Sequence, residues 1–138
     1  MPGAPVEAVQ RVPLFAELKR RDAEQVARLF KQRRFAAGET VAREGSGGAA
    51  FYLIDSGEAT VSVGGAERAT LRAGDYFGEI ALIDEGDRSA TVTAVGELVC
   101  FGLTYWDFRP LVQENAAISW GLLQSVVKKL RTAEARPA

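Results

Sequence analysis

Glycine spacing between residues 35 and 104 constrains the fold of this chain more than any other feature of its sequence. Glycine recurs there at short intervals, and the glycines mark turns between segments that are too short for helices. The β-prone segments between these turns are Thr40–Arg43, Phe51–Asp55, Ala59–Val63, Arg68–Leu71, Ala90–Val95 and Leu98–Leu103. Many short, evenly spaced strands are typical of an antiparallel β-barrel or jelly roll (a double-stranded β-helix), and they argue against a parallel α/β sheet.

The segment Ala59–Val63 shows the strand pattern most clearly. Apolar and polar residues alternate along it, which is the period of a strand with one buried face, and this phase points Val61 into the barrel. Gly64 and Gly65 follow directly and supply the positive φ angles of a tight hairpin. We therefore predict a hairpin whose first strand contributes Val61 to the interior.

The N-terminal part, residues 1–34, is predicted to be helical. Asp22 is the expected N-cap, and Gln25 three residues later can complete a capping box. Apolar residues at helical spacing follow, and the basic runs Lys19–Arg21 and Arg33–Arg34 are interpreted as solvated helix ends.

The C-terminal part, residues 105–133, is also predicted to be helical. Thr104 caps a short helix that Pro110 should disturb near its end, and Asn115 caps a longer helix over residues 116–133. Apolar residues recur every four positions from Ile118 to Leu130, and part of this stripe should pack on the barrel. Helices, barrel and helices together account for residues 1–138 as one domain.

Composition argues against catalysis. The chain has no histidine and one cysteine, which excludes a His-ligated metal centre and a Ser-His or Cys-His nucleophile. We therefore expect a binding protein that is not an enzyme and has no metal and no cofactor. Cys100 cannot form a disulfide within the chain, and a lone cysteine is typical of a reducing, cytoplasmic location.

Charge and hydropathy argue against nucleic-acid and membrane partners. Lys and Arg number 17 against 18 Asp and Glu, so the net charge is −1 and gives no general attraction to nucleic acid or anionic membranes. The apolar stretch Ala49–Ile54 is too short to span a bilayer, and the first residues lack the pattern of a secretory signal. We expect a cytoplasmic protein with no membrane partner.

One segment, residues 76–92, carries the features of an anion site. Gly78 ends a strand and permits close backbone approach, and Glu79–Ile83 can form one helical turn whose leading amides are free to bind an anion. Arg88 opens the next strand, where its planar guanidinium can hold a phosphate through two hydrogen bonds, and Ser89 adds a hydroxyl. Glu79 would repel a phosphate, but it can accept a hydrogen bond from a hydroxyl of the same ligand, such as that of a ribose.

This segment resembles the phosphate-binding cassette of the cyclic nucleotide-binding domain family, which includes catabolite activator proteins and protein kinase A regulatory subunits. The family pattern is Phe-Gly-Glu-(Ile/Leu)-Ala-Leu, five residues, and Arg-(Ser/Ala)-Ala, and it is met without a gap from Phe77 to Ala90. Further similar stretches between Val12 and Arg131 are Pro13-Leu14-Phe15, Gly38-Glu39, Glu44-Gly45, Phe51–Ile54, Ser56-Gly57-Glu58 and Gly74-Asp75.

The resemblance implies a role for each cassette residue. Arg88 would pair with the cyclic phosphate, Ser89 would add a hydrogen bond, and Glu79 would accept from the ribose 2′-hydroxyl. Gly78, with the amides of Ile80 and Ala81, would line the phosphate pocket. The remaining binding residues are Ala90, which ends the cassette motif, and Val61, which would form part of the wall near the base.

The resemblance also assigns the C-terminal helix as a hinge and lid that closes over the base, with Lys129 placed to reach towards Glu79. The helix could also form a homodimer seam. Because Ser89 follows Arg88 where a threonine often accompanies cGMP preference, cAMP is the favoured ligand and cGMP the other candidate. No helix-turn-helix follows the last helix, so we expect no DNA partner and a separate, unidentified effector protein.

Two alternatives remain open. Arg88 can instead form a structural ion pair with Glu79, Asp84 or Asp87 that holds an empty loop in shape. The whole domain would then be a degenerate cyclic nucleotide-binding fold that serves as a protein-interaction or oligomerisation module without ligand. A cupin-type enzyme is set aside, because cupin metal sites need several histidines.

Overall fold

Two four-stranded antiparallel sheets form the centre of the protein. A computed structural model describes residues 3–45, 50–83 and 88–134. One sheet has the order β1-β8-β3-β6 and the other β2-β7-β4-β5. The strands are β1 (Lys31–Phe35), β2 (Thr40–Ala42), β3 (Ala50–Ser56), β4 (Ala59–Val63), β5 (Ala66–Leu71), β6 (Tyr76–Phe77), β7 (Thr91–Ala94) and β8 (Leu98–Thr104). The expected mainly-β fold with flanking helices is confirmed.

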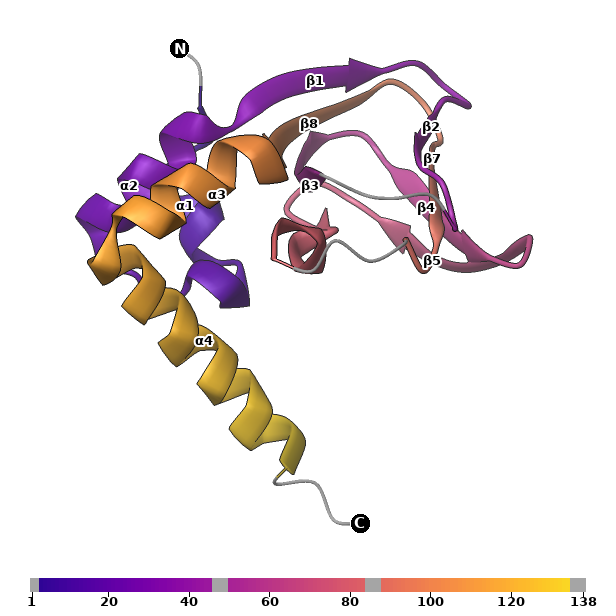
Figure 1. Cartoon of the computed structure of the whole chain (residues 1–138). Coiled ribbons are helices and arrows are strands. Elements are labelled where there is room, and N and C mark those ends of the chain that lie inside the picture. The colour runs from indigo at the N-terminus through magenta and orange to yellow at the C-terminus, as the bar shows by residue number, and fades with distance from the viewer. Residues whose placement is uncertain (1–2, 46–49, 84–87, 135–138) are drawn as a thin grey trace.

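Helices precede and follow the strands and gather at one end of the sheets (Figure 1). The α-helices are α1 (Val6–Gln10), α2 (Arg20–Leu29), α3 (Tyr105–Glu114) and α4 (Ala116–Glu134). Two 3-10 helices complete the described elements, η1 (Pro13–Phe15) and η2 (Glu79–Leu82). The last of these, η2, follows β6 directly and packs beside β3, so one short helix lies at the edge of the first sheet.

Two apolar cores form on opposite faces of the first sheet, because successive side chains of β3 point to opposite sides. Phe51 and Leu53 pack with the helices and with Leu82 of η2, whereas Tyr52 and Ile54 pack between the two sheets. The inner core continues across the second sheet through Ala59, Val92 and Ala94 and their neighbours. Strand β3 therefore connects the helical end of the molecule with the interior of the jelly roll.

The assignment of residues 31–34 to the N-terminal helices is wrong. Helix α2 ends at Leu29, Phe30 is extended, and Lys31–Phe35 form strand β1 paired with β8. Only Phe35 of this strand is buried, and the four residues before it are exposed. The strand lies at the edge of its sheet, so its polar side chains need no alternating apolar pattern. Sequence periodicity alone could not detect it.

The predicted helix caps are correct at two sites and wrong at one. Thr104 Oγ1 accepts from the Asp107 amide, and Asn115 Oδ1 accepts from the Ile118 amide, as expected for N-caps. Helix α2, however, begins at Arg20 after Lys19, so Asp22 lies inside its first turn and is buried. An acidic side chain in that turn still matches the positive end of the helix dipole.

Pro110, which the sequence suggested would disturb helix α3 near its end, lies inside a helix that runs from Tyr105 to Glu114. Pro110 is exposed to solvent. Water can therefore satisfy the carbonyl group that the missing proline N–H leaves without a helical donor.

Helix α4 extends away from the sheets, and its C-terminal half has no sheet beneath it (Figure 1). Its buried residues are Ile118, Gly121, Leu122 and Ser125, and its first half packs against η1 and α3. Gly121 makes this packing possible, since a Cβ there would lie 2.6 Å from Leu18 Cδ2. The buried part of the stripe, Ile118 and Leu122, joins the core on the helical side of the first sheet, where α4 contacts η1 and α3, so the expected packing directly on the barrel is not what the structure shows. No helix in the described part of the chain is long and apolar enough to cross a membrane.

Candidate functional site

Gly78 forms the corner between strand β6 and helix η2. Its φ angle is +85°, in the left-handed region that side chains other than glycine rarely adopt. A Cβ at this position would lie 2.3 Å from Nη1 of Arg88 and 2.9 Å from the carbonyl oxygen of Ala50. Only glycine therefore lets the Arg88 guanidinium and strand β3 approach the backbone here.

The Arg88 guanidinium turns inwards, against β3 and the Gly78 corner. Its Nη2 donates a hydrogen bond of 2.5 Å to the carbonyl oxygen of Ala50, at the start of β3. The Arg88 backbone is fixed too, since its carbonyl accepts from the Gly45 amide at 2.9 Å. The sequence prediction that Gly78 and Arg88 meet is supported by this contact, although the two residues lie on different loops.

The surroundings of Arg88 are partly desolvated. Burial lowers the pKa of its guanidinium, and the nearby Tyr52 phenol acts in the opposite direction. Arginine keeps its charge at neutral pH despite such a shift. The site thus places a full positive charge in an environment where its attraction for an anion is less screened by water than on an open surface.

Glu79 opens helix η2 directly after the corner and is partly buried. Burial raises the pKa of the Tyr76 phenol, and the negative charge of Glu79 adds to that rise, which places the carboxylate near Tyr76. Among residues 3–45, 50–83 and 88–134, no carboxylate lies within 4.0 Å of the Arg88 guanidinium. The ion pair between Arg88 and Glu79 is therefore not formed, while Asp84 and Asp87 lie outside the described residues.

The other cassette residues lie next to Gly78 or Arg88 in the chain. Ile80 and Ala81 lie within η2, whose leading amides have no helical acceptor. Ser89 is exposed and Ala90 is partly buried, and both precede β7. Helix η2 thus adjoins Gly78, and Ser89 and Ala90 adjoin Arg88, in the chain.

Val61 lies in the middle of β4, opposite Val92 of β7 and Ala69 of β5. It is partly buried and packs against the core between the sheets, together with Phe77 of β6. The predicted inward phase of this strand is therefore confirmed. The hairpin beyond it also forms as expected, with φ angles of +60° and +83° at Gly64 and Gly65.

Lys129 does not lie near Glu79. It is exposed on the outer part of α4 and lines a groove with Arg11, Pro13 and Thr132. Because α4 runs away from the sheets in this structure (Figure 1), the predicted contact with the cassette is wrong for this conformation.

Two groups at the site carry no sequence signal that points to them. The Ala50 carbonyl is a backbone acceptor, and because every residue has one, the sequence cannot indicate which carbonyl contacts Arg88. Tyr52 is an aromatic residue in a strand, which normally indicates core packing, and its position opposite Phe77, the residue before the Gly78 corner, emerges only from the pairing of β3 with β6. No cluster of three or more His, Cys, Asp or Glu that could hold a metal ion occurs in the residues the structure describes.

A family model described as "Cyclic nucleotide-binding domain" matches residues 32–115, which include strands β2 to β8, all of β1 except its first residue, and the whole cassette. The chain belongs to the cyclic nucleotide-binding domain family. A cyclic nucleotide-binding domain is a ligand-binding regulatory module, which agrees with the expectation of a binding domain.

Relatives of this cyclic nucleotide-binding domain include kinase regulators and a bacterial receptor. It is 40% identical over 92 residues to a cAMP-dependent protein kinase regulatory subunit of Emericella nidulans, covering 65% of this chain and 22% of that protein. It is 32% identical over 127 residues to a cyclic AMP receptor protein of Thermus thermophilus, covering 88% of this chain and 59% of the receptor. The chain thus spans about a fifth of the kinase regulator and somewhat over half of the receptor.

Among solved structures, the domain is similar to the N-terminal domain of a transcriptional regulator from Streptomyces coelicolor. The TM-score is 0.82 at 26% sequence identity, and the match covers 92% of each chain. The similarity therefore includes the flanking helices as well as the sheets.

Proposed function

We propose that this domain binds a cyclic nucleotide through its cassette and passes the binding event on through helix α4. The observation that carries the proposal is the inward guanidinium of Arg88, held between the Ala50 carbonyl and the Gly78 corner. A fixed, partly desolvated cation beside free backbone amides is suited to a phosphate. Among the described residues, no carboxylate is paired with this guanidinium, so no ion pair there competes with a ligand.

The remaining cassette residues complete the proposed pocket. Arg88 would hold the cyclic phosphate, Ser89 would add a hydrogen bond, and the amides of Ile80 and Ala81 would donate to the other phosphate oxygens. Glu79 would accept from the ribose 2′-hydroxyl. Gly78 would line the phosphate pocket, Ala90 would border it, and Val61 would contact the nucleoside from β4.

We favour cAMP over cGMP as the ligand. Ser89 supports this choice, since a threonine at that position often accompanies cGMP preference in the family. Two relatives, the fungal regulatory subunit and the bacterial receptor, are named for cAMP. The alternative is a degenerate domain that keeps the fold for protein interaction and binds neither nucleotide.

Calorimetric titration of the intact chain with cAMP and with cGMP distinguishes these possibilities. We expect saturable heat with one site per chain and tighter binding of cAMP. If cGMP binds more tightly, the base preference is wrong but the cassette proposal stands. If neither nucleotide gives heat at high protein concentration, the degenerate alternative is correct.

Helix α4 is the element that can transmit binding. A groove of about 610 Å³ separates it from the end of η2, with Leu82 and Ile83 on one side and Leu122, Leu123 and Val126 on the other. A ligand that shifts η2 would change how these apolar residues pack, and α4 can then move towards the cassette. The ligand can favour that position only by its difference in affinity for the two states.

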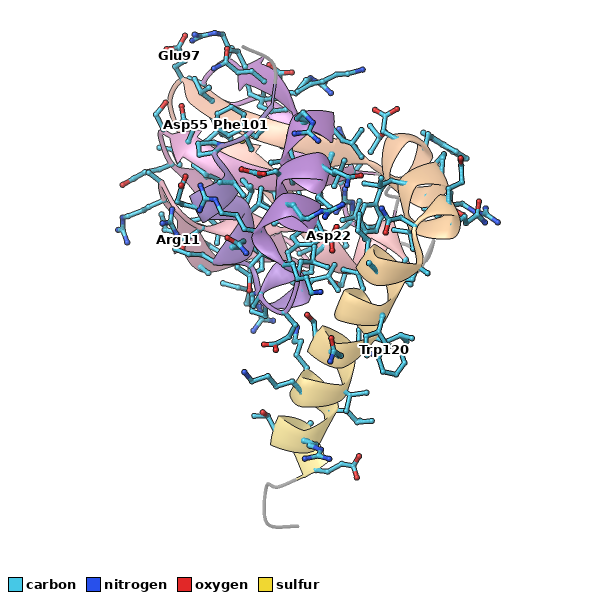
Figure 2. The ribbon with its side chains drawn as sticks, turned by 90° about the vertical axis from the view of Figure 1, so that its left-hand side faces the viewer. Arg11, Asp22, Asp55, Glu97, Phe101 and Trp120 are labelled. Carbon is cyan, nitrogen blue, oxygen red and sulfur yellow. The ribbon has the colours of Figure 1, made fainter. Side chains whose placement is uncertain are left out.

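We also propose that two copies of the chain form a homodimer through helix α4. Its exposed apolar residues Trp120, Leu123, Val127 and Leu130 are spaced alternately by three and four positions, the pattern of a two-stranded coiled coil. Their exposed fractions lie between 47% and 64%, which is unusual for such large side chains. Trp120 points away from the rest of the molecule in Figure 2. An effector protein in the cytoplasm could read the change in α4 on each protomer.

Dimerisation predicts that a charge placed in this stripe separates the protomers. Replacing both Leu123 and Val127 with glutamate should convert a dimer to a monomer, because two buried like charges would face each other. Sedimentation velocity measures the change, with Lys129→Glu on another side of the helix as the charge control. A wild-type chain that sediments as a monomer at high concentration would contradict the dimer.

A further inference from the structure

The side chain of Tyr52 is buried except near its hydroxyl. The exposed fraction of Tyr52 is 6%. The centroid of its ring lies 5.2 Å from that of Phe77, with the two rings stacked, and 5.9 Å from that of Phe35, with the two rings in a T-shaped arrangement. Gly102 makes room for the ring, since a Cβ there would lie 3.1 Å from Tyr52 Cε1. The ring is therefore held from three sides and its orientation is fixed.

Strand pairing places this ring next to the cassette. Tyr52 lies opposite Phe77, the residue before the Gly78 corner, and two positions after Ala50, whose carbonyl holds Arg88. Residues two apart in a strand share a face, so Tyr52 and Ala50 point into the same interior space. The phenol and the guanidinium also interact electrostatically.

The hydroxyl of Tyr52 has no hydrogen-bond partner among the residues that the structure describes, and no fully buried side-chain polar atom there lacks one. The hydroxyl thus reaches solvent at the edge of a buried ring. Water can bond to a hydroxyl that reaches solvent, and a ligand oxygen can replace that water. Because the Ala50 carbonyl of the same strand holds the Arg88 guanidinium, an anion bound by Arg88 can supply such an oxygen.

We propose that the Tyr52 hydroxyl donates a hydrogen bond to an oxygen of the phosphate that Arg88 binds. This inference rests on the proposed function and adds a ligand residue outside the cassette motif. The rigid ring lets the hydroxyl act without loss of side-chain entropy on binding. The Tyr52 hydroxyl therefore favours a ligand whose phosphate oxygen lies within hydrogen-bond distance of this fixed position.

The variant Tyr52→Phe removes only the hydroxyl and keeps the ring packing. We expect it to raise the Kd for cAMP about tenfold, as for a lost hydrogen bond to a charged group. Tyr105→Phe removes a phenol hydroxyl on α3 and serves as the matched control, with an expected change below about twofold. Thermal unfolding of each variant shows that the fold is retained.

The two diastereomers of cyclic adenosine phosphorothioate separate a direct bond from an effect through packing. Sulfur accepts hydrogen bonds weakly, so Tyr52→Phe should weaken binding of one diastereomer and leave the other nearly unchanged. If Tyr52→Phe loses the same affinity for both diastereomers, or if its Kd for cAMP stays within about twofold of wild type, the role of Tyr52 is overturned while the proposed function stands. A wild-type chain that binds no cyclic nucleotide would overturn both.

Discussion

Replacing Arg88 with alanine is expected to weaken cAMP binding by about 30- to 1,000-fold, or about 2–4 kcal/mol. The guanidinium is the positive charge that the structure fixes at the Gly78 corner, so its removal takes away the main attraction for the phosphate. Calorimetric titration of the variant against wild type measures the loss. The effect should exceed that of any other single substitution in the cassette.

Two further variants serve as controls for Arg88→Ala. Arg72→Ala removes an exposed arginine that pairs with Glu58 on the surface, and it should leave the Kd for cAMP unchanged. Arg88→Lys keeps the charge but loses the planar pair of donors, so it should bind cAMP with intermediate affinity. Arg88→Ala with unchanged affinity and a normal unfolding transition would mean that Arg88 has a structural role only.

Gly78→Ala should damage both the fold and the site. The new Cβ would meet Nη1 of Arg88 at 2.3 Å and the Ala50 carbonyl at 2.9 Å, so the guanidinium must move or the corner must open. The left-handed backbone adds strain for alanine. We expect the free energy of unfolding to fall by about 1–3 kcal/mol and the affinity for cAMP to fall at least about tenfold.

Gly74→Ala is the matched control, because Gly74 has a similar φ angle of +93° but a Cβ there would meet nothing within 4 Å beyond its chain neighbours. It should show the backbone strain without the contact with Arg88. Chemical denaturation gives the stability of each variant, and titration gives its affinity. Equal loss of cAMP affinity in the two variants would show that the corner does not position Arg88.

The strands after β1 and the spacing of the cassette were predictable because their signals are local. Glycine turns divide the chain into short segments, and the alternation in Ala59–Val63 fixes which face is inside. The cassette carries its own spacing, so Gly78 and Arg88 could be paired from their positions in the chain. The structure adds the contact between them, which depends on how β3 and β6 align.

The features that escaped prediction depend on the tertiary structure. The polar strand β1 exists because β8 offers a free edge, and its charged residues suit a helix end equally well. The Ala50 carbonyl has no sequence signal, and Tyr52 has the pattern of an ordinary core residue. The direction of α4 follows from the fit of Gly121 on Leu18, which helix periodicity cannot reveal.

Titration of the intact chain with cAMP and with 5′-AMP shows whether the cassette is shaped for a ring-closed phosphodiester. A cyclic phosphate holds one charge at a fixed position beside the 2′-hydroxyl, whereas 5′-AMP is flexible and brings a second negative charge towards Glu79. We predict one cAMP bound per chain and at least about tenfold weaker binding of 5′-AMP. Equal affinity for the two nucleotides, or no binding of cAMP, would contradict the account.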